Sequence, residues 1–144
     1  MEYPFLRTEM LIGSDALIKL KSKRVAVFGL GGVGGYVIEA LARSGIECFY
    51  LFDNDTIAVS NINRQIIATT KTVGMQKVDA AKRRILDINP NANVITNNIF
   101  LLPENSNTIN FKEFDYIIDA VDTVSAKIAA SAIFAKHYRS LDCF

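Results

Sequence analysis

Apolar and polar positions along the chain form two kinds of segment that alternate. Short runs of consecutive apolar residues are followed by longer segments in which apolar residues recur every three or four positions. The first pattern is typical of strands buried on both faces of a sheet, and the second of helices with one buried face. Strands are predicted at residues 24–28, 48–52, 94–99 and 116–120, and helices at residues 14–21, 32–43, 75–88 and 124–137.

The predicted helix boundaries coincide with residues that begin or end helices. Ser14 is a candidate cap for the first helix, and Gly45 follows the second, where glycine commonly ends a helix. Asn89 precedes Pro90, and the residue before a proline is driven out of the helical region, so the third helix should end there. Residues 53–70 are polar and rich in asparagine, and we predict a loop.

Alternation of strands and helices is the pattern of right-handed βαβ units. We therefore predict an α/β fold, a Rossmann-like and largely parallel sheet with helices on both faces. No internal repeat or flexible linker divides the 144 residues, which fit a single domain of ordinary size. A fold of this kind normally uses more chain, so we expect residues 1–144 to be the N-terminal portion of a longer domain, truncated in its C-terminal half.

Composition narrows the class of protein. The chain is 50% hydrophobic and 22% charged, which excludes a disordered chain, and its net charge of +1 gives no general attraction to nucleic acid or membranes. The apolar stretch at residues 25–38 is interrupted by glycines and is shorter than the roughly 20 residues that span a bilayer. The N-terminus lacks the features of a signal peptide, and the two cysteines form no CxxC pair. A cytoplasmic location without membrane contact is expected.

Residues 29–34 (GLGGVG) match the GxGxxG motif between a predicted strand and a predicted helix. In this motif Gly29 permits a tight turn, Gly31 lets the backbone approach a phosphate, and Gly34 lets the helix pack on the strand. Asp53 ends the second strand about 20 residues on, where an acid binds a ribose hydroxyl. A glycine turn kept for packing alone would leave Asp53 unexplained, so we predict a nucleotide site.

Charged residues favour ATP as the nucleotide. Arg64 and Lys77 are cations able to neutralise a triphosphate, and a positioned arginine can contribute roughly 10³–10⁵ to the rate of phosphoryl transfer. Asp119 and Asp122 fall at the C-terminal end of the fourth strand, where open α/β sheets bind ligands. A carboxylate there can hold Mg²⁺ together with substrate phosphates. These are the parts that adenylation of a carboxylate requires.

Each of these assignments has an alternative. Lys77 could be a solvated residue on a helix face, Asp122 could cap the following helix, and Asp55 could be a turn residue. An NAD-dependent oxidoreductase fragment would share the glycine motif, although it would leave Asn61, Arg64 and Lys77 without a role. A non-catalytic nucleotide-binding module is the third interpretation.

These segments resemble the ThiF/HesA/MoeB family of ubiquitin-activating-enzyme-like adenylating proteins. The similar segments are residues 25–34 (VAVFGLGGVG), 51–55 (LFDND), 60–65 (SNINRQ), 73–78 (VGMQKV), 88–90 (INP) and 119–122 (DAVD). They occur in the family's order over nearly the whole chain. The resemblance implies a ThiF-type nucleotide-binding domain that binds ATP and Mg²⁺ and adenylates a carboxylate.

Within the family, the chain is most similar to the branch that acts on threonylcarbamoyladenosine in tRNA. The similarity rests on residues 13–17 (GSDAL), 40–46 (ALARSGI) and 63–65 (NRQ). It implies ATP-dependent activation of the threonylcarbamoyl carboxylate on a modified tRNA adenosine, followed by ring closure with net loss of water. The alternative within the family is adenylation of the C-terminal glycine of a ubiquitin-like sulfur carrier.

The resemblance also implies roles for individual residues. The residues expected to bind ATP are Gly29, Gly31, Gly32, Gly34, Asp53, Asp55, Asn61, Arg64, Gln65 and Lys77. Catalytic roles are implied for Arg64, for Asp122 as the acid that holds Mg²⁺, and for Arg7. Arg7 resembles an arginine that these proteins insert into the ATP site of a partner subunit, which implies a homodimer.

Some features of the chain lie outside this pattern. The resemblance fades after Lys127, and Cys48 and Cys143 match none of the family's cysteines. His137 is expected to be an ordinary helix residue rather than an acid or base. The basic cluster at residues 82–84 could contact tRNA, but a solvated helix face is the preferred interpretation.

Overall fold

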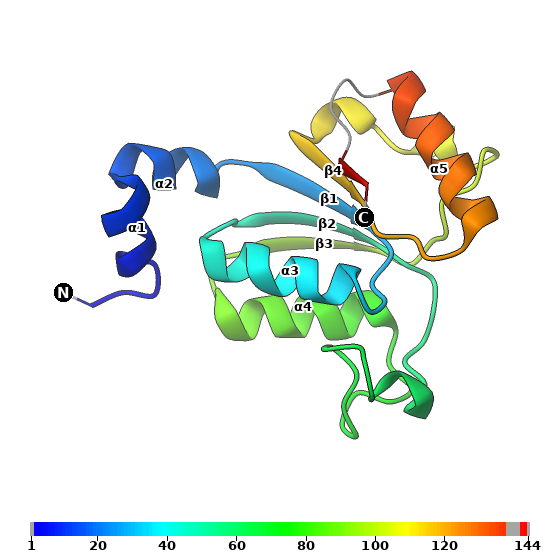
Figure 1. Cartoon of the computed structure of the whole chain (residues 1–144), viewed down its shortest axis with the longest axis horizontal. Coiled ribbons are helices and arrows are strands. Elements are labelled where there is room, and N and C mark those ends of the chain that lie inside the picture. Colours follow the sequence, from blue (N-terminus) through cyan, green and yellow to red (C-terminus); the bar gives the residue numbers. More distant parts are fainter. Residues whose placement is uncertain (1, 138–141, 144) are drawn as a thin grey trace.

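The computed structural model describes residues 2–137 and 142–143 of the chain (Figure 1). Two short helices, α1 (Leu6–Ile12) and α2 (Ser14–Lys21), come first. The strands are β1 (Arg24–Phe28), β2 (Cys48–Phe52), β3 (Asn93–Asn97), β4 (Tyr116–Asp119) and β5 (Asp142–Cys143). The larger helices are α3 (Gly34–Ser44), α4 (Lys77–Ile88) and α5 (Val124–His137), and the 3₁₀ turns are η1 (Val59–Asn61), η2 (Ser106–Thr108) and η3 (Phe111–Glu113).

The strands form one parallel sheet in the order β3-β2-β1-β4-β5. The chain therefore moves outward from β1 to β3 and then returns to the other side of β1. In β1 and β2, Arg24 lies opposite Cys48 and Phe28 opposite Phe52. The loops after β1 and β4 leave the same edge of the sheet, and this reversal of direction is where open α/β sheets bind ligands.

Helices cover both faces of the sheet, with α3 and α4 on one side and α5 on the other (Figure 1). Residues of β1 alternate between the two faces, as the two-residue period of a strand requires. Val25 and Val27 belong to a hydrophobic cluster with α3 and α4, here called the α3–α4 cluster. Ala26 and Phe28 belong to a second, the α5 cluster. The predicted Rossmann-like fold is confirmed.

Aromatic rings fill the α5 cluster around Phe28. Its ring stacks on Phe52 with centroids 4.2 Å apart, and it lies 4.9 Å from the ring of Phe134 and 6.3 Å from that of Phe111. Aromatic pairs contribute about 0.5–1.5 kcal/mol beyond the burial of their area. This packing fixes the ends of β1 and β2 directly beside the glycine-rich loop.

An ion-pair network joins α3 to α4. The buried Glu39 on α3 accepts hydrogen bonds at 2.7 Å on both carboxylate oxygens from Arg84 on α4, and it also pairs with Arg43. The hydrogen bonds from Arg84 hold the pKa of Glu39 below its usual range, although burial acts in the opposite direction. The basic cluster at residues 82–84 is therefore not one solvated surface.

Helix ends agree with the sequence in most places. Gly45 has a φ of 101° in the left-handed region and ends α3, as predicted. Asn89 follows the last residue of α4 and is buried, with its side-chain amide donating to the carbonyl of Ile46 at 3.3 Å. The expected cap at Ser14 is wrong, since Ser14 is the first helical residue of α2 and Gly13 holds the cap position without a side-chain hydrogen bond.

Other differences concern short elements. Helix α1 was not expected, and it buries none of its own side chains. Helix α3 begins at Gly34 rather than residue 32, and α4 begins at Lys77 rather than residue 75. Strand β5 is also additional. Among the helices of the described residues, none has both the length and the apolar character needed to cross a bilayer.

Candidate functional site

A pocket with a cavity volume of about 270 Å³ opens at the C-terminal ends of β1, β2 and β4. Its polar lining comes from the glycine-rich loop, the ends of β2 and β4, the η1 loop and the start of α4. These residues include Gly29, Gly31, Gly32, Asp53, Asp55, Arg64, Lys77 and Asp122. The sequence predicted all of them, and the fold brings them together.

The glycine-rich loop depends on glycine at two points. Gly29 has a φ of 91°, and a Cβ there would lie 2.6 Å from the carbonyl oxygen of Ala120 on the neighbouring strand's loop. A Cβ on Gly34 would overlap the carbonyl oxygen of Gly29. Gly31 differs, because the nearest atom to a Cβ there is the Gln65 Nε2 at 3.8 Å. The loop is thus tightly packed at Gly29 and Gly34, whereas at Gly31 there is room for a further atom.

Asp53 ties the glycine-rich loop to the end of β2. It is buried, and its Oδ2 accepts a hydrogen bond from the main-chain N–H of Leu30 at 2.7 Å. Its Oδ1 accepts from the main-chain N–H of Asp55 at 2.8 Å. Each carboxylate oxygen has a second acceptor position, so these bonds leave capacity for a ribose hydroxyl. That ribose contact stays a prediction.

Lys77 is a buried cation at the edge of this pocket. Its side chain is 8% exposed, and its Nζ lies 3.0 Å from Oδ2 of Asp55. The main-chain N–H of Lys77 also donates to the carbonyl of Asp55 at 2.9 Å. The alternative of a solvated helix-face lysine is therefore wrong. An ammonium is buried in proteins only when it is paired, and Asp55 provides that partner.

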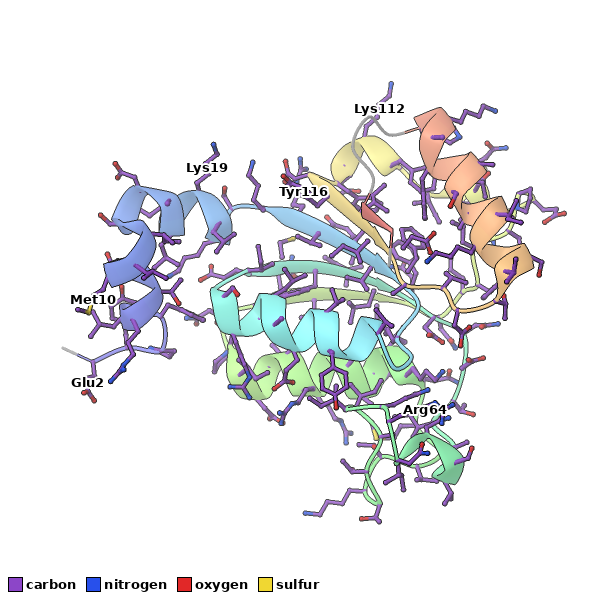
Figure 2. The ribbon with its side chains drawn as sticks, in the orientation of Figure 1. Glu2, Met10, Lys19, Arg64, Lys112 and Tyr116 are labelled. Carbon is purple, nitrogen blue, oxygen red and sulfur yellow. The ribbon has the colours of Figure 1, made fainter. Side chains whose placement is uncertain are left out.

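Arg64 is the second cation of the pocket, and it is exposed. Its Nη1 donates to the carbonyl of Ser60 at 2.9 Å and to Oδ1 of Asn63 at 3.0 Å. Figure 2 shows Arg64 on the loop between β2 and α4, well away from Met10 on α1. Its guanidinium is thus held by its own loop while it faces the pocket.

Asn61 and Gln65 shape this loop. The side-chain Oδ1 of Asn61 accepts a hydrogen bond from the main-chain N–H of Ala58 at 2.9 Å. The main-chain carbonyl of Asn61 accepts one from the main-chain N–H of Gln65, also at 2.9 Å. Asn61 is not among the pocket-lining residues. Gln65 is buried, and its Oε1 has no hydrogen-bond partner within the described part of the chain. A direct phosphate contact by Asn61 stays a prediction, whereas Gln65 lies beside the glycine-rich loop.

Asp122 lines the pocket from the loop after β4 and is exposed. It forms no hydrogen bond or ion pair with another residue that the structure describes, so its carboxylate does not cap α5. Its neighbour Asp119 is fully buried, and the Nζ of Lys127 on α5 donates to the Asp119 carbonyl at 3.3 Å and to that of Val121 at 3.5 Å. Lys127 thus anchors the loop that carries Asp122, a role that the sequence did not suggest.

Arg7 lies away from this pocket. Phe5, which precedes α1, and Leu17 on α2 pack around Gly45 at the C-terminal end of α3. The glycine-rich loop of the pocket lies at the other end of α3, beside Gly34. Arg7 itself is exposed and is not among the pocket-lining residues. A catalytic role for Arg7 would need the pocket of a second copy of the chain.

The apolar wall of the pocket was not predicted. It is formed by residues from the ends of β1 and β2, the loop after β3, and α5, namely Phe28, Phe52, Ile99, Phe100, Leu101, Ala126 and Ala130. Phe28 and Phe52 directly precede Gly29 and Asp53, so the pattern of one aromatic residue before each motif was the available signal. The other wall residues carry no sequence signature.

Carboxylates in the pocket are too few to form a metal cage of their own. Among the described residues there is no group of three or more His, Cys, Asp or Glu side chains placed to hold a metal ion. Mg²⁺ normally binds one or two carboxylates and completes its shell with water and substrate phosphates. The unpartnered carboxylate of Asp122 fits that mode.

The fold is Rossmann-like, and the glycine-rich loop, the buried acid after β2 and the two cations at one pocket are arranged as in nucleotide-binding proteins of that fold. Residues 5–141 match the model of the ThiF family, and the chain belongs to that family.

Known proteins give the same assignment. The chain is 45% identical over 128 residues to the tRNA threonylcarbamoyladenosine dehydratase of Bacillus subtilis, covering 89% of this chain and 50% of that protein. It is 37% identical over 121 residues to the adenylyltransferase and sulfurtransferase UBA4 of Vanderwaltozyma polyspora, covering 84% of this chain and 28% of that protein. The structure of the Escherichia coli tRNA N6-threonylcarbamoyladenosine dehydratase in complex with ATP superposes with a TM-score of 0.90 at 36% identity, covering 97% and 58%. The chain thus spans about half the length of the dehydratases it matches.

Proposed function

We propose that the chain supplies the ATP site of an adenylating enzyme, and that its acceptor is the threonylcarbamoyl carboxylate of a modified tRNA adenosine. The observation that carries the proposal is the placement of Arg64 and Lys77 at the same pocket as the glycine-rich loop. An NAD-binding site does not require two cations there. The 45% identity to a tRNA threonylcarbamoyladenosine dehydratase supports the acceptor.

Different residues at the pocket would bind different parts of ATP. The N–H of Gly29 donates to the carbonyl of Phe52 at 2.9 Å, so Gly29 serves the turn itself. The main-chain amide of Gly31, with the N-terminus of α3, would hold phosphates, because helix N-termini present free N–H groups and a positive dipole. Gly32 and Gly34 keep this turn compact, and Asp53 would hold the ribose. Asn61 and Gln65 would support the loop that carries Arg64.

Adenylation transfers the AMP part of ATP to the acceptor. A carboxylate oxygen attacks the α-phosphorus, the bond from that phosphorus to the bridging oxygen breaks, and pyrophosphate leaves. Arg64 and Lys77 would balance the negative charge that grows on the departing pyrophosphate, the kind of electrostatic stabilisation that contributes most to such reactions. Attack on the activated carbonyl by a nitrogen or oxygen of the same molecule then closes a ring and releases AMP, with net loss of water.

Asp122 would hold Mg²⁺ together with phosphate oxygens of ATP. The ion would supply neutralisation of phosphate charge. Lys127 holds the loop that presents Asp122 through its bonds to the Asp119 and Val121 carbonyls.

Arg7 would act at the pocket of a second copy, which makes the proposed enzyme a homodimer. The support is its position on α1, where it is exposed and away from its own pocket. A cytoplasmic location is compatible with the proposed tRNA substrate and forms part of the proposal.

A ubiquitin-like sulfur carrier is the second candidate acceptor. It is favoured by the 37% identity to the adenylyltransferase and sulfurtransferase UBA4. The ATP chemistry would be the same, and only the carboxylate would differ, being the C-terminal glycine of a protein.

ATP–pyrophosphate exchange in the presence of Mg²⁺ tests the proposal. We expect exchange that depends on tRNA carrying threonylcarbamoyladenosine and is absent with tRNA that lacks the modification. Exchange that requires a ubiquitin-like carrier instead would favour the second acceptor. NADH binding without ATP binding would contradict adenylation altogether, and ATP binding without exchange for any acceptor would indicate a non-catalytic nucleotide-binding module.

A further inference from the structure

Asp55 and Lys77 form an unequal ion pair. The Lys77 side chain is 8% exposed, whereas that of Asp55 is 66% exposed, and the Nζ–Oδ2 distance is 3.0 Å. Within the described residues, Lys77 has no other side-chain partner. A buried ammonium that loses its only partner carries a desolvation penalty, so the position of the Lys77 side chain depends on Asp55.

The main chain fixes the two residues relative to each other. The carbonyl of Asp55 accepts from the N–H of Lys77 at 2.9 Å, and Thr56 and Gln76 form an antiparallel bridge. The N–H of Ile57 donates to the carbonyl of Met75 at 2.8 Å, which extends this contact. The carboxylate of Asp55 therefore approaches Lys77 from a rigid support.

The same support continues to the glycine-rich loop. The N–H of Asp55 donates to Oδ1 of Asp53, and Oδ2 of Asp53 accepts from the N–H of Leu30. One chain of hydrogen bonds thus connects Leu30, Asp53, Asp55 and Lys77, which places the lysine ammonium in a fixed relation to the loop amides.

We infer that Asp55 is a positioning residue, which holds one donor of the Lys77 ammonium and leaves the other two to the phosphates of the nucleotide. An ammonium has three donors, so the bond to Asp55 and bonds to phosphate oxygens are compatible. Asp55 thereby acts through Lys77 rather than by touching the nucleotide itself. This inference rests on the proposed function, because it takes the ligand of Lys77 to be the triphosphate of ATP.

Two substitutions at one position separate hydrogen bonding from charge. Asp55→Asn and Asp55→Ala both remove the carboxylate charge, but only the asparagine keeps an oxygen that can accept from Lys77. We expect Asp55→Asn to bind ATP at least as tightly as the unmodified chain, and Asp55→Ala to bind it about five- to tenfold more weakly than Asp55→Asn. Calorimetric titration with ATP measures both affinities.

Adenosine and a second background provide the controls. Adenosine has no phosphate, so its affinity should be the same in both variants. In a Lys77→Met background the two Asp55 variants should bind ATP equally, because the residue through which Asp55 acts is gone. Asp79→Ala, in the first turn of the same helix and exposed, should change none of these affinities.

Several results would overturn the inference. These are equal ATP affinities of Asp55→Asn and Asp55→Ala, a difference that persists with Lys77→Met, or an equal loss of adenosine binding. Asp55→Ala could lower the unfolding midpoint and weaken ATP binding only by damaging the fold. In that case the difference between the two Asp55 variants would remain in the Lys77→Met background, whereas an effect through Lys77 would disappear there. The proposed function has its own test in the chain without substitutions. If that chain binds ATP no more tightly than adenosine, the proposed ATP site is wrong. This result differs from those above, which contradict only the role of Asp55.

Discussion

Arg84 on α4 donates hydrogen bonds to both carboxylate oxygens of Glu39 on α3, each at 2.7 Å. Glu39 is buried, so removing its main partner leaves a poorly compensated charge. Arg84→Met should lower the free energy of unfolding by about 1–3 kcal/mol at pH 7, less than for a fully buried pair because Arg84 is partly exposed and Arg43 remains. Urea denaturation measures this loss.

The stability that Arg84→Met loses should become smaller as the pH falls. The pKa of Glu39 is lowered by Arg84, so ionised Glu39 stabilises the folded state above its ordinary value of 4.5. This contribution disappears as the pH falls from 4.5 through the lowered pKa. The gap in stability between the unmodified chain and Arg84→Met should therefore narrow over that range. Arg83→Met, next along the helix, should have little effect; a gap that stayed constant in acid would count against the assignment.

Alanine substitutions at two glycines of the same loop should affect different properties, stability at Gly34 and ATP affinity at Gly31. Gly34→Ala would force a Cβ onto the main-chain oxygen of Gly29, so the variant should lose about 3 kcal/mol or more of stability or fail to fold. Gly31→Ala has room for its methyl group and should retain its stability within about 1 kcal/mol. It should nevertheless bind ATP at least about tenfold more weakly, since the methyl group occupies the phosphate approach. Thermal unfolding measures the stability of each variant, and calorimetric titration measures its ATP affinity. An unchanged ATP affinity in Gly31→Ala would show that no phosphate lies close to Gly31.

Arg64 should contribute more to the reaction than to binding. Its guanidinium is exposed and held by its own loop, so its removal should leave the pocket intact. Arg64→Ala should lower the rate of ATP–pyrophosphate exchange by about 10²-fold or more, with a much smaller change in ATP affinity. Arg83→Ala, an exposed arginine that is absent from the pocket lining, serves as the matched control. Equal losses of rate and affinity would mean that Arg64 only assists binding.

Tyr50 should make the fold sensitive to alkali. Burial and a hydrogen bond from its hydroxyl to Oε1 of Glu113 at 2.8 Å raise the pKa of Tyr50 to about 12. A raised value means that the unfolded chain ionises first, so stability should fall as the pH rises from about 10 to about 12. Tyr50→Phe should remove this part of the pH dependence, whereas Tyr36→Phe, at an exposed site, should not. Denaturation at pH 9, 10 and 11 would show the difference, and identical pH curves for both variants would contradict it.

The sheet could be predicted because its signals are local. Strands β1 and β2 are continuous apolar runs, and Gly45 ends α3 through a backbone conformation that glycine favours. The unexpected elements lack such signals. Helix α1 has seven residues and no buried side chain, and β5 has only two residues, so neither produces a readable period.

The polar half of the site could also be predicted, whereas its energetics could not. The glycine motif identified Asp53 by its spacing, and the family resemblance at residues 73–78 included Lys77. That Lys77 is buried against Asp55, and that Asp53 bonds to the loop through Leu30, depends on contacts between segments far apart in the sequence. Lys127 and the apolar wall were missed for the same reason, because an isolated lysine or alanine on a helix has no signature of its own.

The pocket lies where the two hydrophobic clusters meet. Most of its apolar wall, including Phe28 and Ala130, belongs to the α5 cluster, whereas Lys77 begins a helix of the α3–α4 cluster. A bound nucleotide would therefore be held by both layers of the molecule at once, and its binding energy would be available only when both are folded. Loosening the packing of α5, for instance at Phe134, would then be felt as a loss of nucleotide affinity although every phosphate-binding residue is intact.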